Sequence, residues 1–281
     1  MRCLLFDRLA TPAYNCRQSA IYRRVSKRPG RQEACPWLPL SIRVEAMKIL
    51  VLNPNTSEAV TARVAGVVQR IARPSTQVVV KQIPHGPEAL ESYYDEALAT
   101  PYVLEEVKQA VAEQFDAVII AAFCDPGLEA VKEISTIPVY ALEETAFAVA
   151  LLLGNKFSIL TEKKHKVAVK EQHVRKHGLE SRFASVRPLN MGVTEIATNP
   201  ERVRQVGLEV GRRMVDEDGA EVIIMGCASM AGYAEDMERE LGVPVLDPVA
   251  VTFKVVEGLT EIGIHHSKVG LYALPAPKKI N

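Results

Sequence analysis

Two cysteines at matching positions of an internal repeat are the residues of this sequence best suited to chemistry. Cys124 ends an apolar run that starts at residue 115, and Cys227 ends a similar run that starts at residue 219. A helical stretch and an apolar-Pro-Val sequence follow each, so that Pro138 and Pro244 lie 14 and 17 residues beyond the cysteines. These spacings differ by about one helical turn. The repeat predicts two similar halves that present both cysteines to one cleft.

Thiols in such a pair could act as an acid and a base. A single cysteine after a strand is more simply interpreted as a small buried hydrophobe. Two of them at equivalent strand-to-helix junctions favour a functional pair, because the free N–H groups and the dipole of each following helix would stabilise a thiolate. A modest lowering from the usual thiol pKa of about 8.5 would make one cysteine a base near neutral pH while the other remained an acid.

Other uses of these residues have less support. A zinc site needs three or four ligands in characteristic spacings. His173 and His177 are four residues apart, but their Lys and Arg neighbours are typical of a solvated helix face, and His265 and His266 suit the end of a helix. There is no Cys-x-x-Cys motif and no glycine-rich phosphate loop, so neither a metal nor a nucleotide cofactor is indicated. A Cys–His–Asn hydrolase stays open but lacks a local motif.

The segments that must position the cysteines alternate short apolar strands with longer helices. The predicted strands are 48–52, 77–82, 117–122, 139–140, 156–160, 185–187, 222–225, 245–246 and 269–273. The predicted helices are 57–72, 101–114, 128–134, 144–153, 163–177, 200–218, 230–241 and 249–262. Strands that are apolar on both faces indicate parallel sheets covered on both sides. We therefore expect an α/β fold with two pseudo-symmetric lobes, each a mostly parallel sheet flanked by helices, and an active-site cleft between them.

The expected lobes are residues 47–142 together with 250–281, and residues 143–249. Residues 1–46 carry eight Arg and one Lys against three acidic residues and lack a regular apolar period. We expect them to be a disordered extension or an upstream-start artefact, with a targeting segment as the alternative. Two cysteines in the remaining 235 residues do not make a disulfide framework, so a cytoplasmic location is expected.

The amino-acid composition also limits the classes of molecule that the protein could bind. Lys and Arg total 34 and Asp and Glu total 34, whereas nucleic-acid binders usually have a basic excess. No run approaches the roughly 18–20 apolar residues that a membrane-spanning helix needs. We expect no nucleic acid and no membrane as a partner, and a small molecule as the substrate.

Five motifs occur in order along residues 47–281. They are Leu-Asn-Pro-Asn-Thr-Ser at 52–57, Gly-Pro at 86–87 followed by Glu-Ser-Tyr-Tyr-Asp-Glu-Ala at 91–97, Phe-Cys-Asp-Pro-Gly-Leu at 123–128, Gly-Cys-Ala-Ser-Met-Ala at 226–231, and a tail at 267–275. With these motifs the chain resembles the hydantoin racemase branch, which includes allantoin racemases, of the aspartate/glutamate racemase superfamily. The resemblance implies a racemase without a cofactor, a homo-oligomer, and Cys124 and Cys227 as the catalytic pair.

The implied mechanism uses both faces of the substrate. One thiolate removes the proton from the stereocentre, the adjacent carbonyl takes up the charge as an enolate, and the other thiol returns a proton from the opposite side. Backbone N–H groups after the two cysteines are expected to hold the enolate oxygen. The expected substrate-binding residues are Asn53, Asn55, Thr56, Asp125, Gly127, Thr161, Ala228 and Ser229. Helix capping is the alternative for Asp125, and turn formation is the alternative for residues 53–56.

Departures from related motifs favour a neutral substrate. Amino-acid racemases of the superfamily typically have Cys-Asn-Thr and Cys-Thr-Glu, where this chain has Cys124-Asp125-Pro126 and Cys227-Ala228-Ser229. The missing polar groups favour a cyclic ureide, such as a 5-substituted hydantoin or allantoin, over a free amino acid. Open alternatives are aspartate or glutamate racemisation, malonate decarboxylation, maleate isomerisation, or a non-catalytic ligand-binding protein on the same scaffold.

Overall fold

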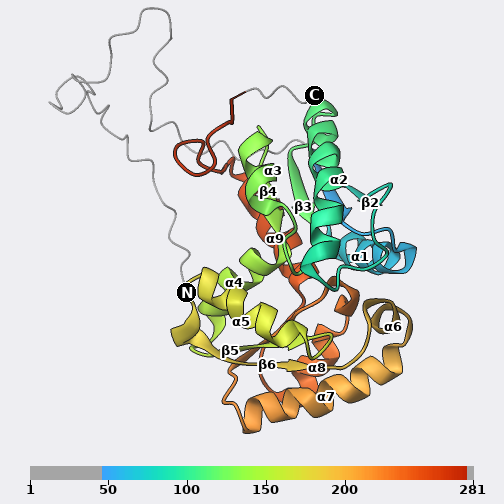
Figure 1. Ribbon diagram of the computed structural model, residues 1–281, viewed down its shortest axis with the longest axis vertical. Helices are drawn as coiled ribbons and strands as arrows, with labels where there is room; N and C mark the ends of the chain where they lie inside the picture. The colour runs from blue at the N-terminus through green and yellow to red at the C-terminus, as the bar shows by residue number, and fades with distance from the viewer. Residues whose placement is uncertain (1–45, 277–281) are drawn as a thin grey trace, which may run out of the picture. The chain divides into compact units, whose positions relative to one another are not determined.

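Two four-stranded parallel sheets organise residues 46–276, the part of the chain that the computed structural model describes (Figure 1). The first sheet has the order β2-β1-β3-β4, and the second has the order β6-β5-β7-β8. The strands are β1 (Met47–Asn53), β2 (Thr76–Gln82), β3 (Ala117–Ile120), β4 (Val139–Ala141), β5 (Phe157–Thr161), β6 (Phe183–Pro188), β7 (Val222–Met225) and β8 (Val245–Leu246). In both sheets the first and third strands along the chain lie in the middle, with the second and fourth at the edges. This common strand order confirms the predicted pair of similar α/β lobes.

Helices cover the sheets, and polar side chains mark where several of them begin. The helices are α1 (Glu58–Ile71), α2 (Tyr93–Ala112), α3 (Leu128–Ile134), α4 (Leu142–Leu153), α5 (Lys166–Lys176), α6 (Val193–Thr198), α7 (Pro200–Asp216), α8 (Ala234–Leu241) and α9 (Pro248–Glu261), with short 3-10 turns η2 (Glu180–Arg182) and η3 (Ala228–Met230). Ser57, Ser92 and Asp247 accept backbone N–H groups at the starts of α1, α2 and α9. Each such cap satisfies a donor that the helix itself leaves free.

A shared hydrophobic core joins the lobes. It includes Ile49 and Ile119 of the first sheet, Ile159 and Ile224 of the second, and buried residues of α1, α4 and α9. Two further cores lie on the outer faces of the sheets, under α2 and α3 in one lobe and under α7 and α8 in the other. The central strands therefore bury both faces, which explains their continuous Ile and Val runs. The shared core sets the strand ends of the two lobes in a fixed relation.

Three segments differ from the sequence-based expectation. Helix α2 contains Pro101 and begins at Tyr93, eight residues before the expected start, because Ser92 caps it. Helix α6 was not predicted. Residues 269–273 form no strand; the tail is instead held by His266, whose ring bonds the backbone of Val139, and by Lys268, which bonds the carbonyl of Lys132.

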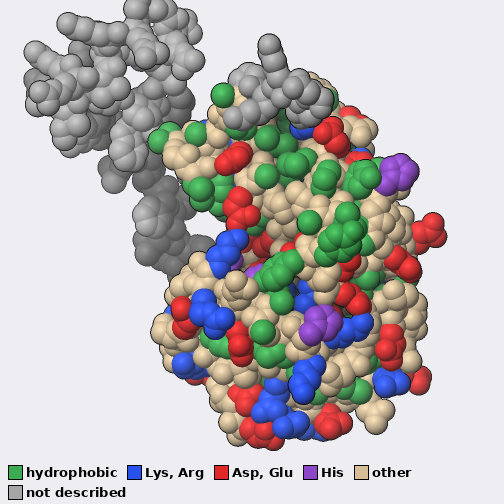
Figure 2. Space-filling view, viewed as in Figure 1, with side chains coloured by type: hydrophobic (Ala, Val, Ile, Leu, Met, Phe, Trp, Pro, Cys, Tyr) green, Lys and Arg blue, Asp and Glu red, His purple; other side chains and the backbone are tan. Residues whose placement is uncertain are grey.

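Acidic and basic side chains are both present on the face of the molecule shown in Figure 2. On the face shown in Figure 2, acidic and basic side chains lie intermixed over the lower half, and no continuous basic surface crosses it. Within residues 46–276, no helix is long and apolar enough to cross a membrane. The expectations for residues 1–45 lie outside the described residues.

Gly226, which precedes Cys227, allows a test of this packing. A Cβ at that position would meet the backbone oxygen of Leu160 at 2.9 Å and Ile159 Cγ2 at 2.8 Å. Gly226→Ala should therefore lower the free energy of unfolding by about 1–3 kcal/mol, because overpacking against backbone is not easily relieved. Gly66→Ala in α1 is the matched control, since its Cβ would have nothing within 4 Å. Urea denaturation would measure both, and equal stability of the two variants would contradict the prediction.

Candidate active site

Cys124 and Cys227 line one cavity at the carboxyl ends of β3 and β7. The cavity has a volume of about 30 Å³. The polar residues that line it with the cysteines are Asn55, Glu162, Lys166, Lys170 and Ser229. The internal repeat thus brings its two cysteines to a common space, and each lobe contributes one of them.

Asp125 caps a helix and does not face this cavity. Its two carboxylate oxygens accept the backbone N–H groups of Glu143 and Glu144 at 2.9 Å each, at the start of α4. Its φ of 48° turns the chain sharply after Cys124. Burial, together with the nearby Glu143 carboxylate, raises the pKa of Asp125 well above its usual range. Of the two interpretations from sequence, helix capping is the one the structure shows, although the helix is α4 rather than the one that follows Cys124.

Gly127 and Asp125 line a second cavity on another side of Cys124. That cavity has a volume of about 400 Å³, and Cys124 belongs to both cavities. Gly127 has a φ of 71°, and a Cβ there would lie 2.8 Å from Thr100 Cγ2, so the position requires glycine. Gly127 therefore shapes the turn and does not contact the space between the cysteines.

The second cysteine sits at the start of the turn η3. Cys227 Sγ lies 2.9 Å from Ser229 Oγ. Ala228 and Ser229 both line the cavity between the cysteines, as expected from their place in the sequence. Ser229 is fully buried, so its hydroxyl is available only to Cys227 and to a molecule in the cavity.

The Asn-Pro-Asn-Thr turn contributes one residue to the cavity, Asn55. The amide nitrogen of Asn53 donates to Asn55 Oδ1 at 2.8 Å and to Thr61 Oγ1 at 2.9 Å, so Asn53 holds the turn from behind. Asn55 Oδ1 also accepts the backbone N–H of Ser57 at 2.9 Å. Thr56 bonds through its backbone to Pro87 and does not line the cavity.

Thr161 likewise does not line the cavity but contacts a residue that does. Its hydroxyl donates to Glu162 Oε2 at 2.7 Å, and both side chains are buried. Glu162, which the sequence analysis did not single out, lines the cavity in its place. Of the eight predicted binding residues, the cavity between the cysteines is lined by Asn55, Ala228 and Ser229.

Helix α5 adds two buried lysines that the sequence analysis also missed. The side chain of Lys170 is 1% exposed, and its ammonium donates to Glu143 Oε2 at 2.8 Å and to the carbonyl of Phe123. Burial opposes the charge of Lys170, but the Glu143 carboxylate outweighs it and raises the lysine pKa above its usual value. Lys166 is 2% exposed, and its ammonium lies 3.5 Å from Glu96 Oε1.

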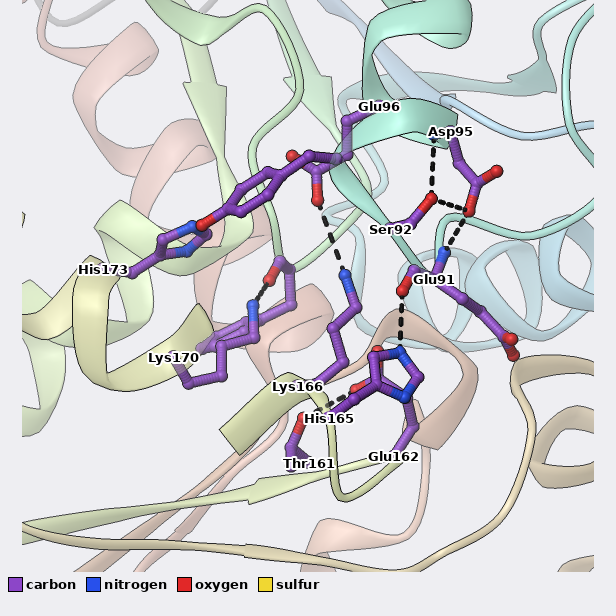
Figure 3. A network of polar contacts seen from close by, with 12 residues as sticks. Glu91, Ser92, Asp95, Glu96, Thr161, Glu162, His165, Lys166, Lys170 and His173 are labelled. Carbon is purple, nitrogen blue, oxygen red and sulfur yellow. Dashed lines mark hydrogen bonds and ion pairs between the residues drawn. The ribbon is translucent and has the colours of Figure 1, made fainter. Parts of the chain in front are cut away.

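These lysines belong to a polar network between α2 and α5 (Figure 3). His173 Nδ1 lies 2.7 Å from Glu143 Oε1, and the Tyr93 hydroxyl donates to Gln172 at 2.9 Å. The expected solvated face holds for His177, which is exposed and packs edge-on against Phe147. It is wrong for His173, which is partly buried and pairs with Glu143. Lys166, Lys170 and Val174 recur every four residues along α5, which is the sequence signal for one common buried face.

Both thiols have a raised pKa, contrary to the expected lowering. Burial is the main cause; it raises the pKa of Cys227 to about 12 and that of Cys124 well above its usual value. Lys170 acts in the opposite direction on both thiols. The expected helix dipoles are weak here, because α3 has seven residues and starts four positions after Cys124, and η3 is a single turn. In the free protein both cysteines are thus mainly neutral thiols near pH 7.

Comparison with known proteins places this arrangement in a family. Residues 49–256 match the family model described as Asp/Glu/Hydantoin racemase. The chain belongs to this family. Over 233 residues it is 38% identical to the hydantoin racemase of Pseudomonas sp. strain NS671, which covers 83% of this chain and 94% of the relative.

Solved racemase structures share the fold of this family member. The allantoin racemase of Klebsiella pneumoniae aligns with a TM-score of 0.80 and 31% identity, covering 84% of this chain and 96% of that one. The allantoin racemase of Pseudomonas fluorescens aligns with a TM-score of 0.79 and 34% identity, covering 84% of this chain and 100% of that one. The predicted resemblance and the predicted two-lobed α/β fold are both confirmed.

The capping role of Asp125 can be tested through stability. Asp125→Ala removes both acceptors from the start of α4 and places alanine at a positive φ, so it should cost about 1–3 kcal/mol. Asp125→Asn keeps one acceptor and a residue type that tolerates this backbone region, so it should cost less than half as much. Thermal unfolding of the two variants checks the order. Parent-like stability of Asp125→Ala would show that the carboxylate does not act as a cap.

Proposed function

We propose that this protein is a cofactor-independent racemase of 5-substituted hydantoins or allantoin, acting through Cys124 and Cys227. The observation that carries the proposal is the presence of both thiols in one cavity, each at the equivalent strand end of one lobe. Membership of the Asp/Glu/Hydantoin racemase family and the similarity to a hydantoin racemase and two allantoin racemases support the same reaction.

The reaction needs one thiolate and one thiol. The thiolate takes the proton from C5 of the substrate, and the electron pair of the broken C–H bond passes into the adjacent carbonyl as an enolate. The opposite thiol then gives its proton to C5 from the other face, which restores the carbonyl and leaves a thiolate on that side. The product is the other enantiomer, and the two cysteines have exchanged protonation states. In the reverse direction their roles exchange.

The raised thiol pKa values fit this role. A base with a high pKa forms a strong bond to the proton that it removes, so a buried thiolate is a better base than an exposed one. The cost is that the thiolate is a minor species near neutral pH. Lys170, which lowers the pKa of both thiols, limits this cost on either side of the substrate.

Polar groups in the cavity suit a ring of alternating carbonyl and N–H groups. Glu162 offers a carboxylate to a ring N–H, while Asn55 and Ser229 offer groups that can donate or accept. A volume of about 30 Å³ holds roughly two water molecules, so some of the side chains that line the cavity must shift when a ureide enters, while the strand ends stay in place. The neighbouring cavity of about 400 Å³, which shares Cys124, gives room for the 5-substituent.

Racemisation of a free amino acid is a second candidate. The lysines and Glu162 supply opposite charges to the cavity, and such charges could hold a carboxylate and an ammonium group. The polar partners that are missing next to the cysteines therefore come from other segments, which weakens the argument from sequence against aspartate or glutamate.

A solvent-exchange screen decides between these reactions. The protein would be incubated in D₂O with L-benzylhydantoin, allantoin, L-aspartate, L-glutamate, a substituted malonate and maleate, without added cofactor. We expect deuterium at C5 and loss of optical rotation with a ureide. Exchange with an amino acid, release of carbon dioxide, or isomerisation of maleate would support the corresponding alternative. Ligand binding without any exchange would indicate a non-catalytic protein.

Single cysteine variants separate the two half-reactions. Cys124→Ser and Cys227→Ser should each lose racemisation by at least about 100-fold, because each removes one proton-transfer group. Each variant should retain exchange at C5 with only one enantiomer, and the retained enantiomer should differ between them, since each remaining thiol faces one side of the ring. Mass spectrometry and chiral chromatography would follow both. Normal racemisation by either variant would contradict the two-base assignment.

The raised thiol pKa values predict the pH dependence. Below its pKa, the thiolate fraction of the free enzyme rises about tenfold per pH unit. The value of kcat/KM should therefore climb with a slope near one from about pH 7 to about pH 9, while the second thiol stays protonated. Rates with Cys124→Ala/Cys227→Ala, measured at the same pH values, give the uncatalysed background. A profile that bends toward a plateau at or below about pH 8.5 would show a thiol with an unraised pKa.

A further inference from the structure

We propose that the Lys166 ammonium binds the carbonyl oxygen on which the enolate charge develops. This inference rests on the proposed function, because it assigns the group that stabilises the intermediate of that reaction. It gives Lys166 a catalytic role that the sequence analysis expected backbone N–H groups to fill.

The backbone groups after Cys124 are not available for this role. The N–H of Asp125 donates to the carbonyl of Ala122 at 3.2 Å. The next residue is Pro126, which has no N–H group. An enolate oxygen near Cys124 therefore needs a donor from another segment.

Lys166 has hydrogen-bonding capacity to spare. Its side chain is 2% exposed and lines the cavity that holds both thiols. The nearest carboxylate atom is Glu96 Oε1 at 3.5 Å, and that buried oxygen has no hydrogen-bond partner among the described residues. An ammonium has three donors, and leaving them unsatisfied in a buried site is costly. A carbonyl oxygen in the cavity would satisfy this group.

Lys170, the other buried lysine, is already engaged. Its ammonium bonds Glu143 Oε2 and the Phe123 carbonyl, and it lies 4.6 Å from the centre of the Phe123 ring. These contacts fix Lys170 beside Cys124. Figure 3 shows Lys166 extending from the start of α5 toward Glu96 on α2, with Lys170 further along α5.

The position of Lys166 also suits the chemical class of substrate. Glu162 lies four residues before it, in the loop between β5 and α5, and lines the same cavity with a carboxylate. A cyclic ureide presents a carbonyl next to an N–H group, so an ammonium donor and a carboxylate acceptor can bind that edge together. When charge moves from a thiolate to the enolate oxygen, a fixed ammonium in a water-poor cavity stabilises the oxygen without having to reorient.

The test compares Lys166→Met with Lys164→Met. Lys164 is exposed on the same segment and outside the cavity, so its variant should exchange deuterium at C5 like the parent. Lys166→Met should lower kcat for exchange by about 100- to 1,000-fold, the usual effect of removing one oxyanion donor. The loss should be similar for both enantiomers, because they share one enolate, whereas loss of a cysteine affects the two unequally.

Further variants separate catalysis from folding. Lys166→Met/Glu96→Gln removes the unpaired carboxylate that the single variant would leave buried, and its far-UV circular dichroism and melting temperature should match the parent. Lys166→Ala should be rescued in part by methylammonium, with a rate that rises with its concentration. A folded double variant that exchanges within about threefold of the parent would overturn the role of Lys166, since one oxyanion donor is usually worth far more. A parent that exchanges neither ureide would overturn the proposed function as well.

Discussion

The buried ion pair between Lys170 and Glu143 is the interaction on which the site depends. An ammonium withdrawn from water loses several kcal/mol of hydration, which only close partners can offset. Here the partners come from separate segments: Glu143 from α4, and the Phe123 carbonyl from the end of β3. Because Phe123 adjoins Cys124, the pair fixes one cysteine relative to α5. Glu143 in turn accepts His173, so the charge is held from two sides.

The shared core gives this ion pair a fixed setting. Helices α1, α4 and α9 contribute buried side chains to one hydrophobic cluster with residues of both sheets. The carboxyl ends of β3 and β7 therefore meet across the cavity with little freedom to slide. Proton transfer to opposite faces of one carbon needs such a fixed arrangement, since small displacements of the reacting groups are costly. Because the two sheets have the same strand order, β3 and β7 hold equivalent places and their carboxyl ends are equivalent positions for the two cysteines.

Sequence patterns predicted the strands, the helices and the cysteine pair, but not the buried charges around them. The two cysteines, eight of the strands and most helices follow from apolar periodicity and from the repeat. The buried lysines did not, because Lys166 and Lys170 lie in a helix whose composition is strongly polar, and a lysine is almost always solvated. Their burial follows from Glu96 and Glu143, partners that are distant in the chain. The predicted lowering of the thiol pKa values was wrong for the same reason. It was based on the local helix starts, whereas the burial that raises these pKa values depends on packing across both lobes.

The charges around the cavity suit a reaction in which a negative charge moves but does not leave. In the proposed racemisation the charge is first on one sulfur, then on an enolate oxygen, and finally on the other sulfur. Lys170 lowers the pKa of both thiols, so the first and last states lie in the field of the same cation. Lys166 lowers the pKa of Cys124 and has unused donors in the cavity, where the intermediate state would form. In the proposed mechanism, with both ammonium groups held by the fold, each proton transfer would exchange one stabilised anion for another in either direction.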